Sequence, residues 1–336
     1  METKYLTGNE VVVDAAIAAG GRMMFGYPIT PSTEITTEFA KKAEKNERLK
    51  FIQTEDETSA GFGVIGALLG GEKAFTATGG PGNILMQDPI SMAEAMRLPF
   101  VGIITQRGGP STGTVIYSQQ EVTLTCCGGN GEGLRVVYSP SSLQEIYDLT
   151  IKTFNTAWKY RFPTFLLSDG YMAKARQKVE IYRPQYISTT KHILGDARKI
   201  VNIRNTYSQE EELNEILSEN IRDFEHISRD IADYDTYKCT HSKTIIFAHG
   251  SAAAACLEIC KERKNVGLFR PITLQPFPDS QAKMFAKRAQ KIIVVESSAG
   301  QFSRLLKNSL YGISTIYLEY QRPALGIFEE ELARVL

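Results

Sequence analysis

Residues 22–34, RMMFGYPITPSTE, run from an apolar segment through a turn with two prolines into a segment of helical pattern. Proline fixes its own backbone and disfavours helix in the preceding residue, so the helix is expected to begin only after Pro31. Thr30 is thereby held on a stiff turn, where its hydroxyl can bind a small oxygen-rich ligand. An ordinary helix-entry turn, with Ser32 or Thr33 as N-cap, explains the same residues.

The same succession of strand, glycine or proline turn, and helix repeats from residue 1 to residue 180. The predicted strands are Arg22–Gly26, Lys50–Gln53, Lys73–Thr78, Phe100–Thr105, Arg135–Tyr138 and Thr164–Leu167. The predicted helices are Asn9–Ala19, Thr33–Lys45, Thr58–Leu69, Ile84–Arg97 and Ser142–Trp158, the last with Ser142 and Glu145 at capping-box spacing. This alternation predicts a parallel sheet with helices on both faces and a ligand site at the carboxyl ends of its strands.

Residues 181–240 break this pattern and predict a linker with one amphipathic helix, which packs on its own chain or on a sister subunit. Its apolar stripe is Leu213, Ile216, Leu217, Ile221, Phe224, Ile227 and Ile231. Residues 241–336 predict a second, smaller α/β domain. Its strands are Thr244–His249, Val266–Phe269, Lys291–Glu296 and Thr315–Tyr320, and its helices are Ala252–Arg263, Ser280–Ala289 and Gln301–Leu310.

Composition excludes several classes of protein. Among the 336 residues, 38 Lys and Arg balance 38 Asp and Glu, so the chain lacks the basic excess of a nucleic-acid or membrane-surface binder. The longest nearly apolar run, Gly61–Gly71, is shorter than the ~20 residues that span a bilayer. The first residues do not have the layout of a secretory signal, so a cytoplasmic location is expected.

Five cysteines are present, and no Cys-x-x-Cys-x-x-Cys run exists that would hold an iron–sulfur cluster in this chain. Cys256 and Cys260 lie four residues apart on a predicted helix, where we interpret them as packing residues rather than metal ligands. No metal site is predicted.

Three further loops follow predicted strands: QTEDE (53–57), TGGPGN (78–83) and QRGGPSTG (106–113). A carboxylate at the buried start of the helix after residue 57 is a candidate for a perturbed pKa, and the glycines of that helix indicate close packing of a backbone or a flat ligand. The second loop matches neither a P-loop nor Gly-x-Gly-x-x-Gly. Arg107 is placed to bind a carboxylate or to form a structural salt bridge. Together these groups suit a small 2-oxo or carboxylate ligand without naming a reaction.

Several of these segments carry a family resemblance. Tyr27–Pro31 (YPITP) resembles the signature of the 2-oxoacid:ferredoxin oxidoreductases, in particular the alpha subunits of the 2-oxoglutarate and branched-chain types. The similarity continues through Thr7–Ala19, Glu55–Ala67, Thr78–Met86, Gln106–Gly113, Phe269–Pro278 and Val294–Phe302.

The resemblance implies a thiamine-diphosphate-binding, pyrimidine-type parallel-sheet domain and a smaller, transketolase-C-terminal-like α/β domain. It implies oxidative decarboxylation of a 2-oxoacid with coenzyme A to acyl-CoA and CO₂, with electrons passed to ferredoxin. By motif, Glu57 is expected to face the aminopyrimidine. Further cofactor contacts are expected from Tyr27, Pro28, Ile29, Gly80 and Pro81, and substrate contacts from Thr30, Arg107, Ser111 and Thr112.

The chain also lacks parts of such an enzyme. No Gly-Asp-Gly motif for Mg²⁺ and diphosphate occurs, so the resemblance implies a beta-type subunit that holds them, and gamma-type and ferredoxin-like subunits for the iron–sulfur clusters, in a dimer of heteromers. Gly79, Thr114–Ile116 and Gln120–Thr123 depart from the family pattern in loops expected to shape the substrate pocket or partner contacts, and they leave the substrate open. The alternatives are a non-catalytic assembly paralogue and a thiamine-dependent lyase or transketolase-like component.

Overall fold

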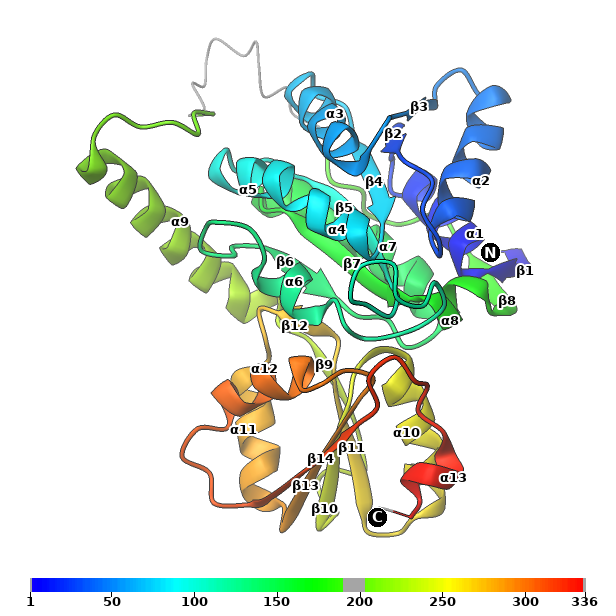
Figure 1. Ribbon diagram of the computed structural model, residues 1–336, viewed down its shortest axis with the longest axis vertical. Helices are drawn as coiled ribbons and strands as arrows, with labels where there is room; N and C mark the ends of the chain where they lie inside the picture. The colour runs from blue at the N-terminus through cyan, green and yellow to red at the C-terminus, as the bar shows by residue number, and fades with distance from the viewer. Residues whose placement is uncertain (1, 190–202, 335–336) are drawn as a thin grey trace.

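A seven-stranded sheet forms the centre of the upper domain in Figure 1. The computed structural model describes residues 2–189 and 203–334. In that part of the chain the strand order is β12 (Thr273–Gln275), β6 (Val136–Tyr138), β7 (Thr164–Asp169), β5 (Val101–Gln106), β4 (Ala74–Thr78), β2 (Met23–Gly26) and β3 (Lys50–Gln53). All neighbouring strands are parallel except β12, which pairs antiparallel with β6. The predicted parallel sheet is therefore confirmed.

Helices cover both faces of this sheet. On one face lie α1 (Gly8–Ala18), α2 (Thr33–Glu44) and α7 (Leu143–Tyr160), and on the other lie α3 (Glu57–Leu69) and α5 (Gln87–Ala95). On the first face Phe75 of β4 packs edge-on against Phe39 and Phe154, at centroid distances of 5.3 and 5.6 Å.

Two glycines of α3 are explained by this packing. A Cβ on Gly61 would lie 2.4 Å from Pro89 of α5, and a Cβ on Gly63 would lie 2.4 Å from the ring of Phe25 in β2. Close approach of protein groups, rather than of a flat ligand, therefore accounts for these two positions. At Gly66, by contrast, a Cβ would meet no atom of the described residues within 4 Å.

The single helix predicted over Ile84–Arg97 is wrong, because the chain forms α4 (Pro81–Leu85) and then α5. Pro89 has no N–H to donate to the carbonyl of Leu85, so a continuous helix would lose that hydrogen bond. The Thr58 hydroxyl donates to this carbonyl instead, at 3.2 Å.

Several elements of this part of the chain were not predicted. They are the antiparallel pair β1 (Glu2–Thr7) and β8 (Arg176–Ile181), and the short helices α6 (Val122–Cys127) and α8 (Gly170–Lys174).

The amphipathic helix predicted in the linker is α9 (Glu210–Ile231), on the left of Figure 1. Phe224 in its C-terminal half is buried and packs edge-on against Phe162, with ring centroids 5.1 Å apart. Leu213, near its first turn, is 39% exposed. The helix therefore packs on its own chain through its C-terminal half. No helix within the described ranges has both the length and the apolar content needed to cross a membrane.

The second domain contains a five-stranded sheet in the described residues, lower in Figure 1. Its order is β14 (Ile316–Gln321), β13 (Lys291–Glu296), β10 (Thr244–Phe247), β11 (Val266–Pro271) and β9 (Tyr234–Tyr237), and only β9 is antiparallel. Around it lie α10 (Gly250–Glu262), α11 (Asp279–Arg288), α12 (Gln301–Ser309) and α13 (Glu329–Leu332). Cys256 and Cys260 are buried in its hydrophobic core.

The motif around Glu296 has a structural role in this domain. Its buried carboxylate accepts hydrogen bonds from Phe302 N at 2.9 Å and Ser303 N at 3.0 Å, at the start of α12. A carboxylate at a helix N-terminus satisfies free amide groups and complements the helix dipole.

Across residues 2–189 and 203–334, no three His, Cys, Asp or Glu side chains lie close enough together to hold a metal ion.

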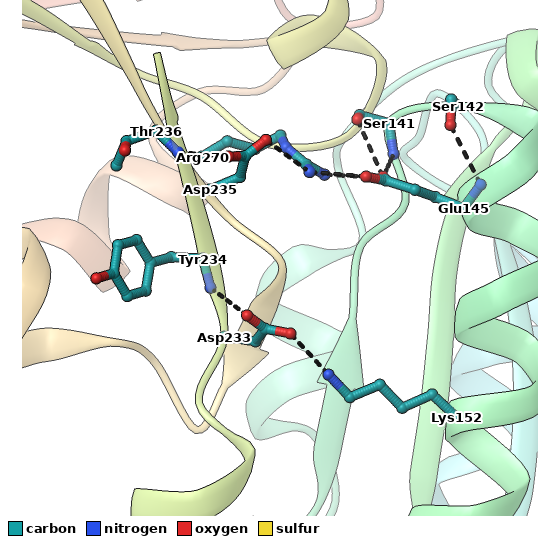
Figure 2. Close-up of polar contacts among 9 residues, drawn as sticks. All are labelled: Ser141, Ser142, Glu145, Lys152, Asp233, Tyr234, Asp235, Thr236 and Arg270. Carbon is teal, nitrogen blue, oxygen red and sulfur yellow. Dashed lines mark hydrogen bonds and ion pairs between the residues drawn. The ribbon is translucent and has the colours of Figure 1, made fainter. Parts of the chain in front are cut away.

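Ion pairs join the two domains along α7, as Figure 2 shows. The Arg270 guanidinium of β11 donates to both carboxylate oxygens of Glu145, at 2.7 and 2.8 Å, and Lys152 contacts Asp233 at 2.7 Å.

Only one of the two hydrogen bonds of the capping box predicted at Ser142 and Glu145 is present. Ser142 Oγ accepts from Glu145 N at 3.2 Å, but the Glu145 carboxylate accepts from Ser141 N at 2.7 Å rather than from the N-cap amide. The bond to Arg270 directs this carboxylate away from the predicted position.

We expect Glu145→Gln to lower the free energy of unfolding by about 2 kcal/mol, because it leaves the buried Arg270 guanidinium without its bidentate carboxylate. Lys152→Met is the matched control on the same helix. Both members of the Lys152–Asp233 pair are more than a third exposed, so its loss is expected to cost about 0–1 kcal/mol. Equal losses in urea denaturation would contradict the difference assigned to burial.

Candidate functional site

Glu57 is placed by the start of α3. Asp56 is the N-cap, with its Oδ1 accepting from Ser59 N at 2.6 Å, so Glu57 takes the first helical position. The Glu57 residue is 4% exposed, whereas Glu55, two positions earlier, is exposed. Burial raises the pKa of the Glu57 carboxyl above its ordinary value. Its Oε1 atom is buried and has no hydrogen-bond partner among the described residues.

Thr78 and Gly82 meet Glu57 at the carboxyl end of β4. A Cβ on Gly82 would lie 2.1 Å from Thr78 Oγ1 and 2.3 Å from Glu57 Oε1. The Thr78 hydroxyl oxygen is also buried without a partner in the described part of the chain. Buried polar atoms are rarely left without hydrogen bonds, and those that are require an explanation. These two point to a ligand that supplies the bonds.

Arg107 follows β5, the neighbouring strand, and is 6% exposed. Its Nη1 donates to the carbonyl oxygen of Thr30 at 2.8 Å, and its buried Nε has no partner within the described residues. A Cβ on Gly80 would lie 2.4 Å from that Nε. The alternative of a structural salt bridge is wrong for the described ranges, because no carboxylate there forms an ion pair with Arg107. The guanidinium thus keeps donors for a further acceptor.

Glu121 is a buried residue of the site that sequence reasoning missed. Its Oε1 accepts from Gly80 N at 2.8 Å and from Arg107 N at 3.0 Å, and its Oε2 accepts from Asn83 Nδ2 at 3.0 Å. Burial raises the pKa of Glu121, while these donors favour its ionised form. Two sequence signals were present: the departure of Gln120–Thr123 from the family pattern, and a run of amide and acid side chains, QQE at 119–121. Neither distinguishes a buried carboxylate from a solvated loop.

The remaining predicted residues divide into two groups. Gly80 and Pro81 open α4, in which Gly82 contacts the Glu57 carboxylate, and the Thr30 carbonyl contacts Arg107. Tyr27 and Pro28 are exposed on the turn after β2 and Ile29 is partly buried; the Thr30 side chain is exposed. Ser111 and Thr112 lie in an exposed loop, and within the described residues no hydrogen bond joins them to Glu57 or Arg107. The structure therefore gathers Glu57, Thr78, Gly80, Gly82 and Arg107.

Comparison with known families matches both domains. Residues 14–249 match the model described as pyruvate flavodoxin/ferredoxin oxidoreductase, thiamine-diphosphate-binding, and residues 242–320 match pyruvate:ferredoxin oxidoreductase core domain II. Among curated proteins, the 2-oxoglutarate synthase subunit KorA of Methanocaldococcus jannaschii is 33% identical, over 90% of each chain. The ketoisovalerate oxidoreductase subunit VorB of Methanothermobacter thermautotrophicus is 33% identical, over 90% of this chain and 88% of that protein.

Solved structures show the same fold. The 2-oxoglutarate:ferredoxin oxidoreductase of Magnetococcus marinus superposes with a TM-score of 0.88 at 24% identity, over 99% of this chain and 64% of that chain. A split-gene transketolase superposes with a TM-score of 0.57 at 11% identity, over 98% of this chain and 91% of that chain.

The gathered residues fit the aminopyrimidine of thiamine diphosphate. Glu57 Oε1 and Thr78 Oγ1 are buried polar atoms without protein partners in the described ranges, and both pack directly against Gly82, where a side chain would clash with them. A heteroaromatic ring with ring nitrogens and an amino group supplies the missing hydrogen-bond partners of a carboxylate and a hydroxyl. From the family matches, the chain belongs to the 2-oxoacid:ferredoxin oxidoreductase family, as an alpha subunit with a thiamine-diphosphate-binding domain.

Proposed function

We propose that this chain forms part of the active site of an oxidoreductase that decarboxylates 2-oxoglutarate or a branched-chain 2-oxoacid, transfers the acyl group to coenzyme A and passes electrons to ferredoxin. The single observation that carries the proposal is the buried Glu57 carboxylate, unpartnered at Oε1 among the described residues, beside Thr78 and Gly82. The names of the similar proteins support 2-oxoglutarate and ketoisovalerate as the first substrates to test.

Glu57 is proposed to hold the aminopyrimidine and exchange a proton with it. When bound, thiamine diphosphate supplies a carbanion and an electron sink for the substrate carbonyl. The raised pKa of Glu57 brings the carboxyl closer to the range in which it can both donate and accept a proton near neutral pH. Its packing against Gly82 supports this role, because a confined carboxylate presents its proton in a defined direction.

Arg107 is proposed to bind the carboxylate of the 2-oxoacid, with the Thr30 hydroxyl, Ser111 and Thr112 as further substrate contacts. Its guanidinium is buried and charged, and one nitrogen is already fixed by the Thr30 carbonyl. A positioned guanidinium gives strong, charge-assisted hydrogen bonds to a carboxylate. Tyr27, Pro28, Ile29, Gly80 and Pro81 are proposed to surround the cofactor.

Partner subunits are proposed to complete the site. On α3 and α4, the two helices that meet at Glu57 and Gly82, Phe62, Ile84 and Leu85 are 37%, 58% and 48% exposed, and exposed apolar side chains suit a subunit contact. We propose that a beta-type subunit covers it and holds Mg²⁺ and the diphosphate, and that gamma-type and ferredoxin-like subunits hold the iron–sulfur clusters in a cytoplasmic dimer of heteromers.

We further propose a division of the chain into a pyrimidine-type domain at 1–180, a linker at 181–240 and a transketolase-C-terminal-like domain at 241–336. Two strands cross this division: β9, within the linker, extends the second sheet, and β12, within the second domain, extends the first. These crossings support a fixed arrangement of the two domains.

The test is co-expression with the partner subunits, followed by measurement of CO₂ release from 2-oxoglutarate, 2-oxoisovalerate and pyruvate. We expect turnover that requires thiamine diphosphate, coenzyme A and ferredoxin. A complex that assembles but turns over none of the three would support the non-catalytic paralogue, and turnover without ferredoxin would support the lyase or transketolase-like alternative.

Arg107→Gln in that complex is expected to raise the KM for the 2-oxoacid roughly tenfold or more, because a charged hydrogen bond to the substrate is lost. The affinity for thiamine diphosphate should change little. An unchanged KM would remove Arg107 from the substrate site.

A further inference from the structure

Glu121 connects two loops that are far apart in sequence. It is 41 residues from Gly80 and 14 residues from Arg107, and its Oε1 accepts a backbone hydrogen bond from each. Because one oxygen binds both amides, the glycine loop and the start of the arginine loop are held at a fixed separation. The Arg107 side chain then packs against Gly80, where a Cβ would lie 2.4 Å from Nε.

The neighbours of Glu121 require a carboxylate at this position. Asn83 Nδ2 donates to Glu121 Oε2 at 3.0 Å and to Thr125 Oγ1 at 3.1 Å, while Asn83 Oδ1 accepts from Gln87 Nε2 at 3.0 Å. The side-chain amide of Asn83 therefore cannot exchange the positions of its oxygen and nitrogen without losing the hydrogen bond from Gln87 Nε2. A glutamine at 121 would direct its own NH₂ group against an N–H donor on one side or the other.

The second domain holds the backbone on both sides of Glu121. Gln301, the first residue of α12, donates from Nε2 to the Gln120 carbonyl at 2.7 Å and accepts at Oε1 from Thr123 N at 3.0 Å. One residue before Gln120, the backbone N–H of Gln119 donates to the Ser297 carbonyl, and Ser297 N donates to Gln119 Oε1. Both hydrogen bonds are 3.0 Å long. The segment that carries Glu121 is thus fixed by contacts from the other domain.

We infer that Glu121 is a positioning residue, which sets the location of the Arg107 guanidinium through the backbones of Gly80 and Arg107, and that Gln301 of the second domain keeps Glu121 in place. This inference rests on the proposed role of Arg107 in binding the substrate carboxylate. The second domain thereby contributes to substrate binding through a chain of hydrogen bonds rather than by direct contact.

The test uses Glu121→Gln in the assembled holoenzyme and has two measurements. Exchange of the backbone amide hydrogens of Gly80 and Arg107 is expected to become roughly tenfold faster, because the substitution changes the carboxylate oxygen that accepts from both. The KM for the 2-oxoacid is expected to rise roughly tenfold with a smaller change in kcat, because the loss acts on ground-state binding of the substrate. Gln301→Ala should shift both measurements in the same direction by a smaller factor, which keeps the test open if Glu121→Gln does not fold.

Glu145→Gln is the matched control. Glu145 is also a carboxylate that accepts from a backbone N–H and from charged donors, but its partners are Ser141 and Arg270. We expect it to leave the KM and the exchange of the Gly80 and Arg107 amides unchanged. Unchanged exchange in both Glu121→Gln and Gln301→Ala would overturn the inference. Faster exchange together with an unchanged KM in Arg107→Gln would instead contradict the proposed role of Arg107.

Discussion

Glu57→Gln is expected to lower 2-oxoacid turnover by about 10²–10⁴-fold in the assembled enzyme, because the amide cannot take part in proton exchange with the cofactor ring. The side chain is 4% exposed, and Gln has nearly the same shape as Glu, so the substitution keeps the space between Thr78 and Gly82 filled. The N-cap of α3, Asp56, is untouched. Folding should therefore survive while the chemistry is lost.

The measurement is steady-state turnover of the co-expressed complex, with thiamine-diphosphate affinity and thermal unfolding recorded for the same preparation. Glu55→Gln is the matched control, since Glu55 lies two residues earlier in the same loop and is exposed. It removes the same charge and is expected to leave turnover unchanged. Near-normal turnover in Glu57→Gln would refute the role of this carboxylate. A loss of equal size in the control would show that local charge, and not proton exchange, is responsible.

Local patterns were sufficient to predict the elements that surround Glu57. Strand β3 has the predicted bounds, Lys50–Gln53, and α3 begins within one residue of the predicted start. The carboxylate predicted at the buried start of this helix is Glu57, the first residue after the N-cap Asp56, whereas Glu55 lies outside the helix and is exposed. These features depend on residues within one or two turns of each other, which a sequence pattern records directly.

Features that depend on distant residues were not predictable in the same way. β12 is a three-residue strand that pairs antiparallel with β6, more than a hundred residues earlier in the chain, and short segments of this kind carry little periodic signal. The Glu145 carboxylate was predicted to bond within its own helix terminus, but Arg270 from the other domain redirects it. In both cases a tertiary contact decides the local geometry.

The residues of the candidate site also divide into those that local sequence predicted and those that depend on distant contacts. Glu57, Arg107 and the Gly80 turn each follow a strand of one parallel sheet, so their meeting at one sheet edge followed from the order of strands and turns. Glu121 follows no strand, and its burial depends on donors from Gly80 and Asn83 at the start of α4 and from Arg107 after β5. Nothing local in QQE, residues 119–121, specifies those partners.

Gly82→Ala is expected to lower turnover by about 10²-fold or more, because the new methyl group would enter the space between Glu57 and Thr78. Its Cβ would lie 2.3 Å from Glu57 Oε1 and 2.1 Å from Thr78 Oγ1, both far inside van der Waals contact. Either the Glu57 carboxylate moves or α4 shifts outward, and both changes displace the atoms that are proposed to bind the aminopyrimidine. The affinity for thiamine diphosphate, measured by titration of the assembled complex, should fall together with turnover.

Gly102→Ala separates this effect from general overpacking. Its Cβ would lie 2.6 Å from the Phe165 ring within the sheet, so it introduces a comparable clash against an apolar ring instead of against the polar atoms of the site. Overpacking of this kind costs about 1–3 kcal/mol of stability, and we expect the folded fraction to keep its turnover and its cofactor affinity. If Gly82→Ala lost only stability, as Gly102→Ala is expected to do, the Glu57 and Thr78 oxygens that pack against Gly82 would not belong to the cofactor site.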